Sequence, residues 1–227
     1  MTTLTTRNEI VKTKKIIGSE LTKIQKVFYD EEVLQCYRDD NEEHLYWELF
    51  DSLKNEEIEY SAFNKIIGLN HSDISTFTKK LTDKIIELFR KIDVNELIVI
   101  SHLKLDFFGN RDNKFKPLKN AYKMLEKIVG DNTYKEAFKI DIENLPDFIE
   151  ILFWTTRCDP GIAEYVFVFD QNEQMRFNVC KYGNLHLTEY NKEQLTENSL
   201  RELGWSVIDG QEFDNFTDDG KIKGRRI

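Results

Sequence analysis

Apolar side chains recur at intervals of three or four residues through much of the first 150 positions of the chain. The pattern is strongest over 72–92, where the apolar positions are Ile74, Phe77, Leu81, Ile85, Leu88 and Ile92. Such spacing lines one face of a helix. Ser72 or Asp73 can cap the first turn, because a short side-chain oxygen accepts hydrogen bonds from the free amides there. We therefore predict a helix over 72–92.

Three neighbouring segments carry weaker or more ambiguous patterns. Mixed spacings of three and four predict helical structure over 21–37, with a break near Asp30, and over 41–53. The segment 94–110 is dense in apolar residues and suits either a buried helix or a strand, because periodicity alone does not separate the two. We favour a helix for 94–110.

Two further helices are predicted from proline at the first turn, where its missing N–H costs nothing. The first begins at Pro117 and is followed by Gly130, which suits the position after a last helical turn. The second begins near Pro146 and places Arg157 close to its C-terminus. A cation there complements the partial negative charge of the free carbonyl groups.

The period of the pattern changes after Pro160. Three segments alternate at every second residue or are apolar on both faces: 164–170, 174–180 and 185–190. A period of two is the spacing of β-strands, and the short polar connections, one of which contains Gly183, indicate hairpins. We predict an antiparallel meander, followed by a helix over 192–203 and a short apolar segment.

These patterns predict an α+β fold, in which a predominantly helical N-terminal two-thirds is followed by a small antiparallel β-meander closed by a helix. We expect a single domain over 1–227. If the chain subdivides, 1–158 forms the helical region and 159–227 forms the meander with its helix.

The formal net charge of −9 at pH 7 narrows the possible partners. Direct nucleic-acid binding is disfavoured, because phosphate contacts need clustered Lys and Arg side chains. An acidic protein can instead attract a basic protein partner. The apolar runs are too short to span a bilayer, no secretory signal is visible, and three cysteines without a CxxC pair fit a reducing compartment. We expect a cytoplasmic protein without membrane contact.

A polar corner between the last long helix and the meander holds the candidate pocket residues, namely Arg157, Cys158, Asp159, Glu164 and His186. Cys158 can act as a nucleophile if His186 lies beside it in the fold. No known local signature surrounds this cysteine, and intracellular cysteines are most often simply packed. The corner therefore fits either an enzyme pocket or a structural turn, and we favour the turn.

Motifs for metals and cofactors are missing from the sequence. The four histidines are isolated from one another, and the chain has no HExxH, no glycine-rich phosphate loop and no GxSxG. We therefore expect neither a dedicated metal site nor a cofactor.

Two acidic stretches are the candidate partner-binding surfaces. The stretch 30–44 holds seven acidic residues and one basic residue, whereas 209–220 holds five acidic residues and no basic one. Two phenylalanines lie among the acids of the second stretch, and they either anchor a partner or tuck into the core. The candidate contact residues are Asp39, Asp40, Glu42, Glu43, Glu212, Phe213, Asp214, Phe216, Asp218 and Asp219.

Acidity, these two stretches and the lack of catalytic signatures favour a protein-binding protein. We expect an inhibitor of the bacterial immunity or antitoxin kind, which neutralises a basic toxin, such as a nuclease, by direct contact. One alternative is an enzyme without a familiar motif, with its pocket near Arg157, Asp159 and His186. Another is a regulatory or scaffold protein that binds a peptide at an exposed edge of the meander.

Overall fold

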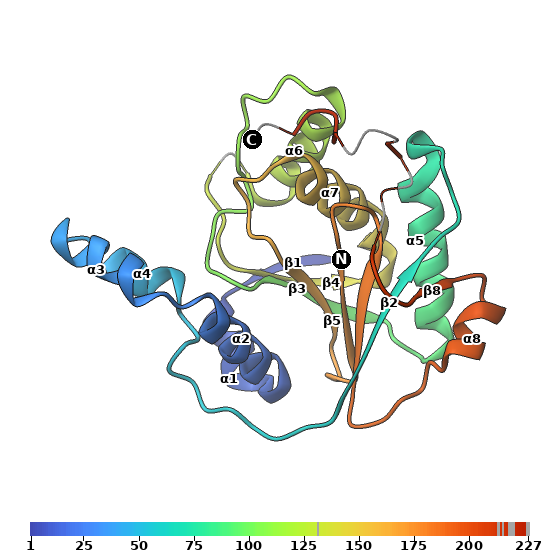
Figure 1. Ribbon diagram of the computed structural model, residues 1–227, viewed down its shortest axis with the longest axis horizontal. Coiled ribbons are helices and arrows are strands. Elements are labelled where there is room, and N and C mark those ends of the chain that lie inside the picture. The colour runs from blue at the N-terminus through green and yellow to red at the C-terminus, as the bar shows by residue number, and fades with distance from the viewer. Residues whose placement is uncertain (131, 213, 215, 218–220, 226–227) are drawn as a thin grey trace.

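The computed structural model describes residues 1–130, 132–212, 214, 216–217 and 221–225 (Figure 1). The strands are β1 (Thr2–Thr5), β2 (Ala62–Gly68), β3 (Glu96–Ser101), β4 (Ala137–Asp141), β5 (Val166–Asp170), β6 (Met175–Val179), β7 (Leu185–Tyr190) and β8 (Ser206–Ile208). The helices are α1 (Arg7–Thr13), α2 (Lys15–Phe28), α3 (Glu31–Asp39), α4 (Glu43–Leu49), α5 (Ile74–Lys91), α6 (Lys116–Val129), α7 (Leu145–Cys158) and α8 (Glu197–Glu202), with a 3-10 turn η1 (Ile142–Asn144).

Within the described residues, the eight strands form one antiparallel sheet in the order β1-β4-β3-β5-β6-β7-β2-β8. The predicted meander β5-β6-β7 lies inside this sheet, because β5 pairs with β3 and β7 pairs with β2. The expectation of a helical N-terminal two-thirds followed by a small meander is therefore wrong: helices and strands are interspersed, and β1 to β4 come from the first two-thirds. A division at residue 158 would cut through the sheet.

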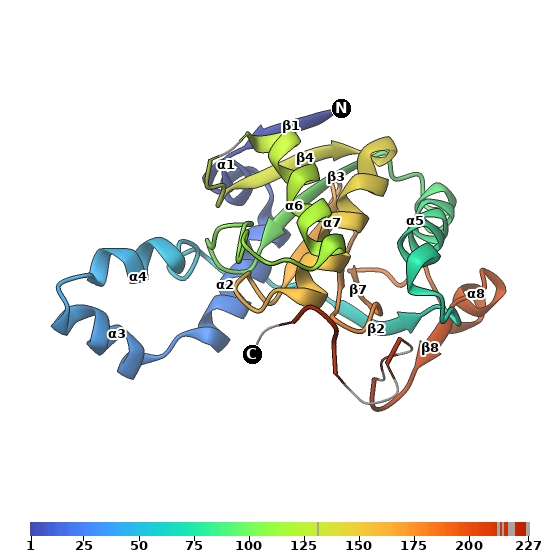
Figure 2. The ribbon, with the colours of Figure 1, turned by 90° about the horizontal axis from the view of Figure 1, so that it is seen from above.

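Helices cover both faces of the sheet, as Figures 1 and 2 show. On one face, Ile10, Ile17 and Leu21 of α1 and α2 pack against a cluster that includes Ile98 and Phe167. On the other face, α5, α6 and α7 form the larger core with the opposite sides of the same strands. Full burial of each such side chain contributes on the order of 1.5–3 kcal/mol relative to exposure.

The segment 94–110 is strand β3 followed by a loop, and not the helix expected there. Leu97 and Val99 belong to the core under α5–α7, whereas Ile98 and Ile100 belong to the core under α1 and α2. A strand covered on both faces has no polar alternation, so its apolar run matches a buried helix as well as a strand. Because helices cover both faces of β3, the sequence pattern did not distinguish a strand from a helix.

Most other predicted elements are confirmed. Helix α5 begins after Asp73, whose side chain accepts a hydrogen bond from the amide of Ser75 at 3.0 Å. Helix α6 has Pro117 in its first turn, and α7 has Arg157 in its last turn. The strands after Pro160 are confirmed as β5, β6 and β7, whereas the helix expected over 192–203 is shortened to α8.

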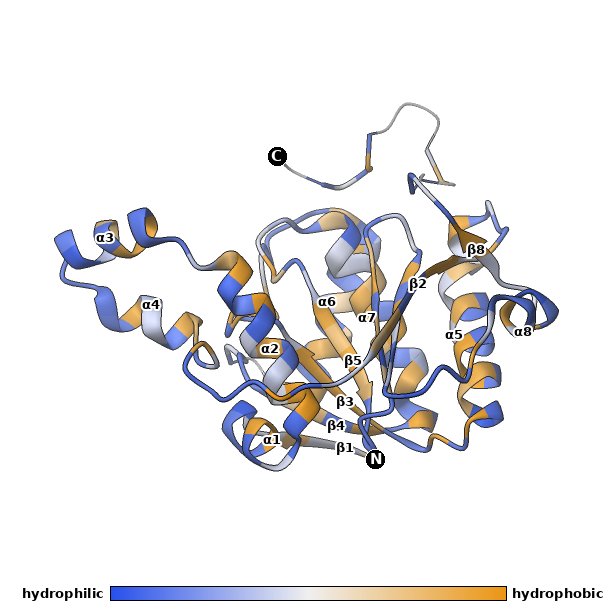
Figure 3. Ribbon diagram, turned by 60° about the horizontal axis from the view of Figure 1, so that its bottom comes forward, coloured by the Kyte–Doolittle hydropathy of each residue, from blue (hydrophilic) through white to orange (hydrophobic). Residues whose placement is uncertain are grey.

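Helices α3 and α4 form a hairpin that projects from the body of the molecule (Figures 2 and 3); residues 30–50 are called the arm below. The expected break near Asp30 is confirmed, because its side chain caps α3 by accepting from the amides of Glu32 and Val33. The arm has its own small core around Leu34, Tyr46 and Phe50, which also contacts Leu103 of the body.

No helix in the described part of the chain combines the length and the apolar character that crossing a bilayer requires.

Candidate functional site

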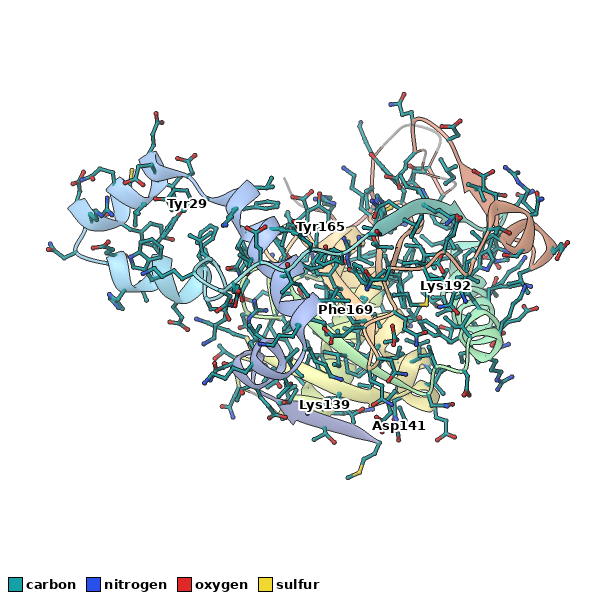
Figure 4. All side chains as sticks on the ribbon, turned by 90° about the horizontal axis from the view of Figure 1, so that it is seen from below. Tyr29, Lys139, Asp141, Tyr165, Phe169 and Lys192 are labelled. Carbon is teal, nitrogen blue, oxygen red and sulfur yellow. The ribbon has the colours of Figure 1, made fainter. Side chains whose placement is uncertain are left out.

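A pocket of about 400 Å³ lies where the end of α7 and the loop after it face the β6–β7 hairpin. Residues of the C-terminal segment after β8 complete its wall. The lining residues with polar chemistry include Asp159, Glu164, Tyr165, Cys180, His186 and Glu212. Tyr165 is labelled in Figure 4, where it lies near the base of the arm.

The register of the β6–β7 hairpin brings Cys180 and His186 to the same side of the sheet. Asn178 pairs directly with His186, so their side chains share one face. Cys180 follows Asn178 by two residues and returns to that face, because side chains alternate along extended backbone. The turn closes through Gly183, which has φ +86° and leaves room for Phe77: a Cβ there would lie 2.8 Å from the ring.

Glu212 reaches this pair from the C-terminal segment. The Cys180 thiol donates to Oε2 of Glu212 at 3.0 Å, and Nδ2 of Asn184 donates to the same oxygen at 3.1 Å. Nε2 of His186 lies 3.1 Å from the other carboxylate oxygen, Oε1. Burial alone would raise the pKa of the Glu212 carboxyl, but the bonds from Cys180 and Asn184 and the neighbouring His186 together lower it. Glu212 is therefore held as a carboxylate inside the pocket.

The thiol of Cys180 is not prepared to act as a nucleophile in this arrangement. Burial first, and then the hydrogen bond to Glu212 and the charge of that carboxylate, raise the pKa of Cys180 to about 12. Since the thiolate is the reactive form of cysteine, the protein alone keeps this sulfur protonated at neutral pH.

Asp159 and Glu164 line the pocket together with His186. The sequence predicted these three residues to lie near one another. Asp159 is nevertheless fully engaged: it accepts from the amides of Asn110 at 2.6 Å and Gly161 at 2.8 Å and from the hydroxyl of Tyr122. Gly109 lies so close that a Cβ there would be 2.6 Å from the carboxylate. Asp159 ties a turn together, while Glu164 is exposed at the pocket rim.

Arg157 and Cys158 do not line the pocket. The Arg157 side chain is 2% exposed, donates to the backbone oxygen of Lys181 at 2.8 Å and forms an ion pair with Asp214 at 2.9 Å. Cys158 is fully buried, and burial raises the pKa of its thiol to about 11. The structure therefore does not bring Cys158 and His186 together as a nucleophile and its base, and it makes Arg157 a structural anchor.

The described part of the second acidic stretch turns inward. Glu212 lines the pocket, the Asp214 side chain is only 7% exposed, and Phe216 packs at ring-centroid distances of 4.8 Å from Phe77 and 6.0 Å from Phe153. Three further candidate contact residues, Phe213, Asp218 and Asp219, lie outside the described residues. Among the described acids of this stretch, Asp209 is exposed directly after β8, whereas Glu212 and Asp214 turn inward.

The first acidic stretch is presented outward on the arm. Asp39, Asp40 and Glu42 are exposed around the connection between α3 and α4, and Glu43 is half-buried at the start of α4. Arg38 is shared by two carboxylates, Glu31 at 2.8 Å and Glu43 at 3.1 Å. Four candidate contact residues thus lie together at the end of the hairpin.

No sequence motif marks the group formed by Cys180, His186 and Glu212. Cys180 and His186 are six residues apart on a predicted hairpin, and a count of strand alternation across a tight turn could have placed them on one face. Glu212 had no such signal, because its position depends on how the C-terminal segment packs.

Comparison of the chain with protein-family models, with curated proteins and with solved structures gave no match.

Proposed function

We propose that this protein binds a basic protein partner through the arm, and that it inhibits that partner as an immunity protein or antitoxin does. The observation that supports this proposal is the separation of the arm from the body: an acidic hairpin projects into solvent, where a partner can reach it from several sides (Figure 2).

The charge on the arm is strongly one-sided. Its single basic residue, Arg38, is already engaged by Glu31 and Glu43. Within the described part of the chain, no basic side chain forms an ion pair with Asp40 or Glu42. Such a surface attracts a cationic protein over roughly a Debye length, which is about 8 Å at physiological salt, and raises the rate of encounter.

The arm also has the rigidity and the apolar contacts that a docking surface needs. Tyr46 stacks on Phe50 at 4.5 Å between ring centroids, so the hairpin is held in shape before any partner binds. Val33 and Leu45, one on each helix, keep 45% and 41% of their surface exposed among the acids. Charge guides the encounter, the apolar side chains add buried area, and a preformed hairpin loses little entropy on binding.

The test begins with capture of partners by the tagged protein from a lysate of its source organism, at low and at raised salt. The retained protein is then purified, its affinity for this chain is titrated, and its own activity is measured with and without this chain. We expect a basic partner held in near-equal amount, an affinity that falls as salt rises, and loss of the partner's activity in the complex.

A pair of charge-reversal variants assigns the binding to the arm. The triple variant Asp39→Lys/Asp40→Lys/Glu42→Lys should weaken binding by about tenfold or more. The control variant Asp83→Lys/Glu87→Lys/Glu202→Lys makes the same change of charge at exposed positions on α5 and α8, away from the arm (Figure 1). Equal affinity of the two variants, or capture of no basic protein, would refute the proposal.

A further inference from the structure

The pocket gathers three side chains of the kinds that bind transition metals. Sγ of Cys180, a ring nitrogen of His186 and a carboxylate oxygen of Glu212 all lie within 4.8 Å of one another. They come from the end of β6, from β7 and from the segment after β8, so only the folded chain brings them together. Each offers one donor atom toward a common centre.

The ring of His186 directs Nε2 at the Glu212 carboxylate. Nε2 of His186 is buried, and among the described residues it takes part in no hydrogen bond. It lies 3.1 Å from Oε1 of Glu212, close enough for an ion pair but not aligned for a hydrogen bond. A buried nitrogen whose polar contact is poorly aligned carries an energetic cost, because it has lost water without gaining a full hydrogen bond. A metal ion in contact with this nitrogen would remove that cost.

The surroundings of Glu212 support the same geometry. Nδ2 of Asn184 donates to Oε2 of Glu212 at 3.1 Å and so orients the carboxylate, in the way that outer partners orient metal ligands. Arg225 also lines the pocket, but it forms no ion pair with Glu212, and its side chain lies 3.5 Å from the backbone oxygen of Arg157. Arg225 therefore leaves the carboxylate available.

We propose that Cys180, His186 and Glu212 form a binding site for a borderline divalent transition-metal ion, with zinc as the best match. One thiolate, one imidazole and one carboxylate are ligand types that zinc accepts, whereas magnesium and calcium require oxygen ligands. Binding transfers the proton of the Cys180 thiol to solvent, and the sulfur then bonds to the metal.

Three protein ligands leave a fourth position in a tetrahedral zinc site. That position faces the pocket of about 400 Å³, so it can take water or an anionic small molecule. Bound zinc also links the C-terminal segment to the β6–β7 hairpin through Glu212. The proposal departs from the expectation of no dedicated metal site, because the ligands are 6 and 26 residues apart and match no sequence motif.

Metal binding is tested on the full-length, metal-free protein with zinc chloride as the probe. Competition with a chromophoric chelator measures stoichiometry and affinity, and cobalt substitution reports sulfur coordination through a thiolate-to-metal absorption band. We expect one zinc per chain and a cobalt–thiolate band. Cys180→Ser should abolish the band, and His186→Gln and Glu212→Gln should each weaken zinc binding by about tenfold or more.

Matched controls use the same residue types at exposed positions on the arm. Cys36→Ser and His44→Gln should leave both the affinity and the band unchanged. Zinc-edge X-ray absorption of the unaltered protein adds a measurement that does not depend on how the variants fold: it should show one sulfur at about 2.3 Å from the metal. Binding that is not stoichiometric, a spectrum without sulfur, or equal weakening by the control variants would overturn the proposal.

Discussion

The arm and the C-terminal segment look alike in sequence and are opposite in structure. Both combine a run of acids with aromatic residues. On the arm the acids are exposed, including Asp39, Asp40 and Glu42, whereas Glu212 and Asp214 of the C-terminal segment point into the protein. A run of acidic residues therefore does not by itself identify a binding surface.

The difference lies in where the aromatic residues pack. On the arm, Tyr46 contacts both Tyr37 and Trp47, so the hairpin buries its own rings and leaves its acids outside. In the C-terminal segment, Phe216 packs against Phe77 and Phe153 of the main core. Because Phe216 packs there, the neighbouring carboxylates lie inside the protein, and Asp214 forms an ion pair with Arg157.

The strongest test of this comparison is removal of the inward-facing acid. Asp214→Ala leaves the Arg157 guanidinium, which is 2% exposed, without its carboxylate. Breaking a buried ion pair in this way should lower the free energy of unfolding by about 3–5 kcal/mol. Urea denaturation measures the change, and Asp39→Ala on the arm is the control, with an expected change of about 0.5 kcal/mol or less. A small effect of Asp214→Ala would mean that this segment is not anchored as described.

The pH dependence of the free energy of unfolding tests the packing where the arm joins the body. His102 contacts Phe28 at the end of α2. Burial lowers the pKa of His102 from 6.5 to about 4, and the charge of Arg7 adds to this effect. The Tyr165 carbonyl and the charge of Glu164 oppose it. The unfolded chain therefore binds the proton first. Proton binding by the unfolded chain favours unfolding, so the free energy of unfolding falls as pH drops from 6.5 toward 4. The loss is about 2–3 kcal/mol at pH 4.5.

The variant His102→Gln isolates this effect from that of other acidic groups. We expect the free energy of unfolding of the variant to fall less between pH 7 and pH 4.5 than that of the unaltered protein, as measured by urea denaturation at both values. Identical pH dependence of the two proteins would show that His102 has the same pKa in the folded and unfolded states.

Removal of the inward-facing ring should have a smaller effect than removal of the buried charge. Phe216 is half-buried, so Phe216→Ala gives up part of an aromatic contact and should cost about 1–2 kcal/mol. Thermal unfolding measures the loss. The matched change on the arm, Leu45→Ala, removes a side chain that is 41% exposed and should cost less. A larger cost for Leu45→Ala would reverse the comparison.

The smallest expected effect is that of neutralising the outward-facing acids. Asp39→Asn/Asp40→Asn should change the free energy of unfolding by about 0.5 kcal/mol or less, because these groups are solvated. The same variant should weaken capture of a basic partner at low salt. On the arm, a substitution would then weaken binding without changing the free energy of unfolding. In the C-terminal segment, each substitution of an anchoring residue would lower the free energy of unfolding.

Secondary structure with a clear period and a clear boundary could be predicted from the sequence. Helix α5 has a full apolar stripe and an aspartate cap, and α6 has proline at its start and glycine after its end. Strand β3 lacked such a signal, because covering both faces of a strand removes its alternation. Strands β1, β2 and β4 pair with partners that are distant in the sequence.

The pocket was predictable only in part. Asp159, Glu164 and His186 were placed in one neighbourhood because they flank the same turn and hairpin, and they line one pocket. Arg157 and Cys158 belong to the same helix end but face the interior. Cys180 was not identified, and Glu212 was assigned to a partner-binding surface and not to the pocket, since neither carries a motif.

The sequence alone determined local features: the boundaries of α5 and α6, the alternation of β5 to β7, and the one-sided charge of the arm. Only the tertiary structure decided that the meander joins a larger sheet, that one acidic run faces solvent while the other faces the core, and that Cys180, His186 and Glu212 converge. The physical reason is that local propensity acts over a few residues, whereas strand pairing and burial depend on competition among distant apolar surfaces for the same core.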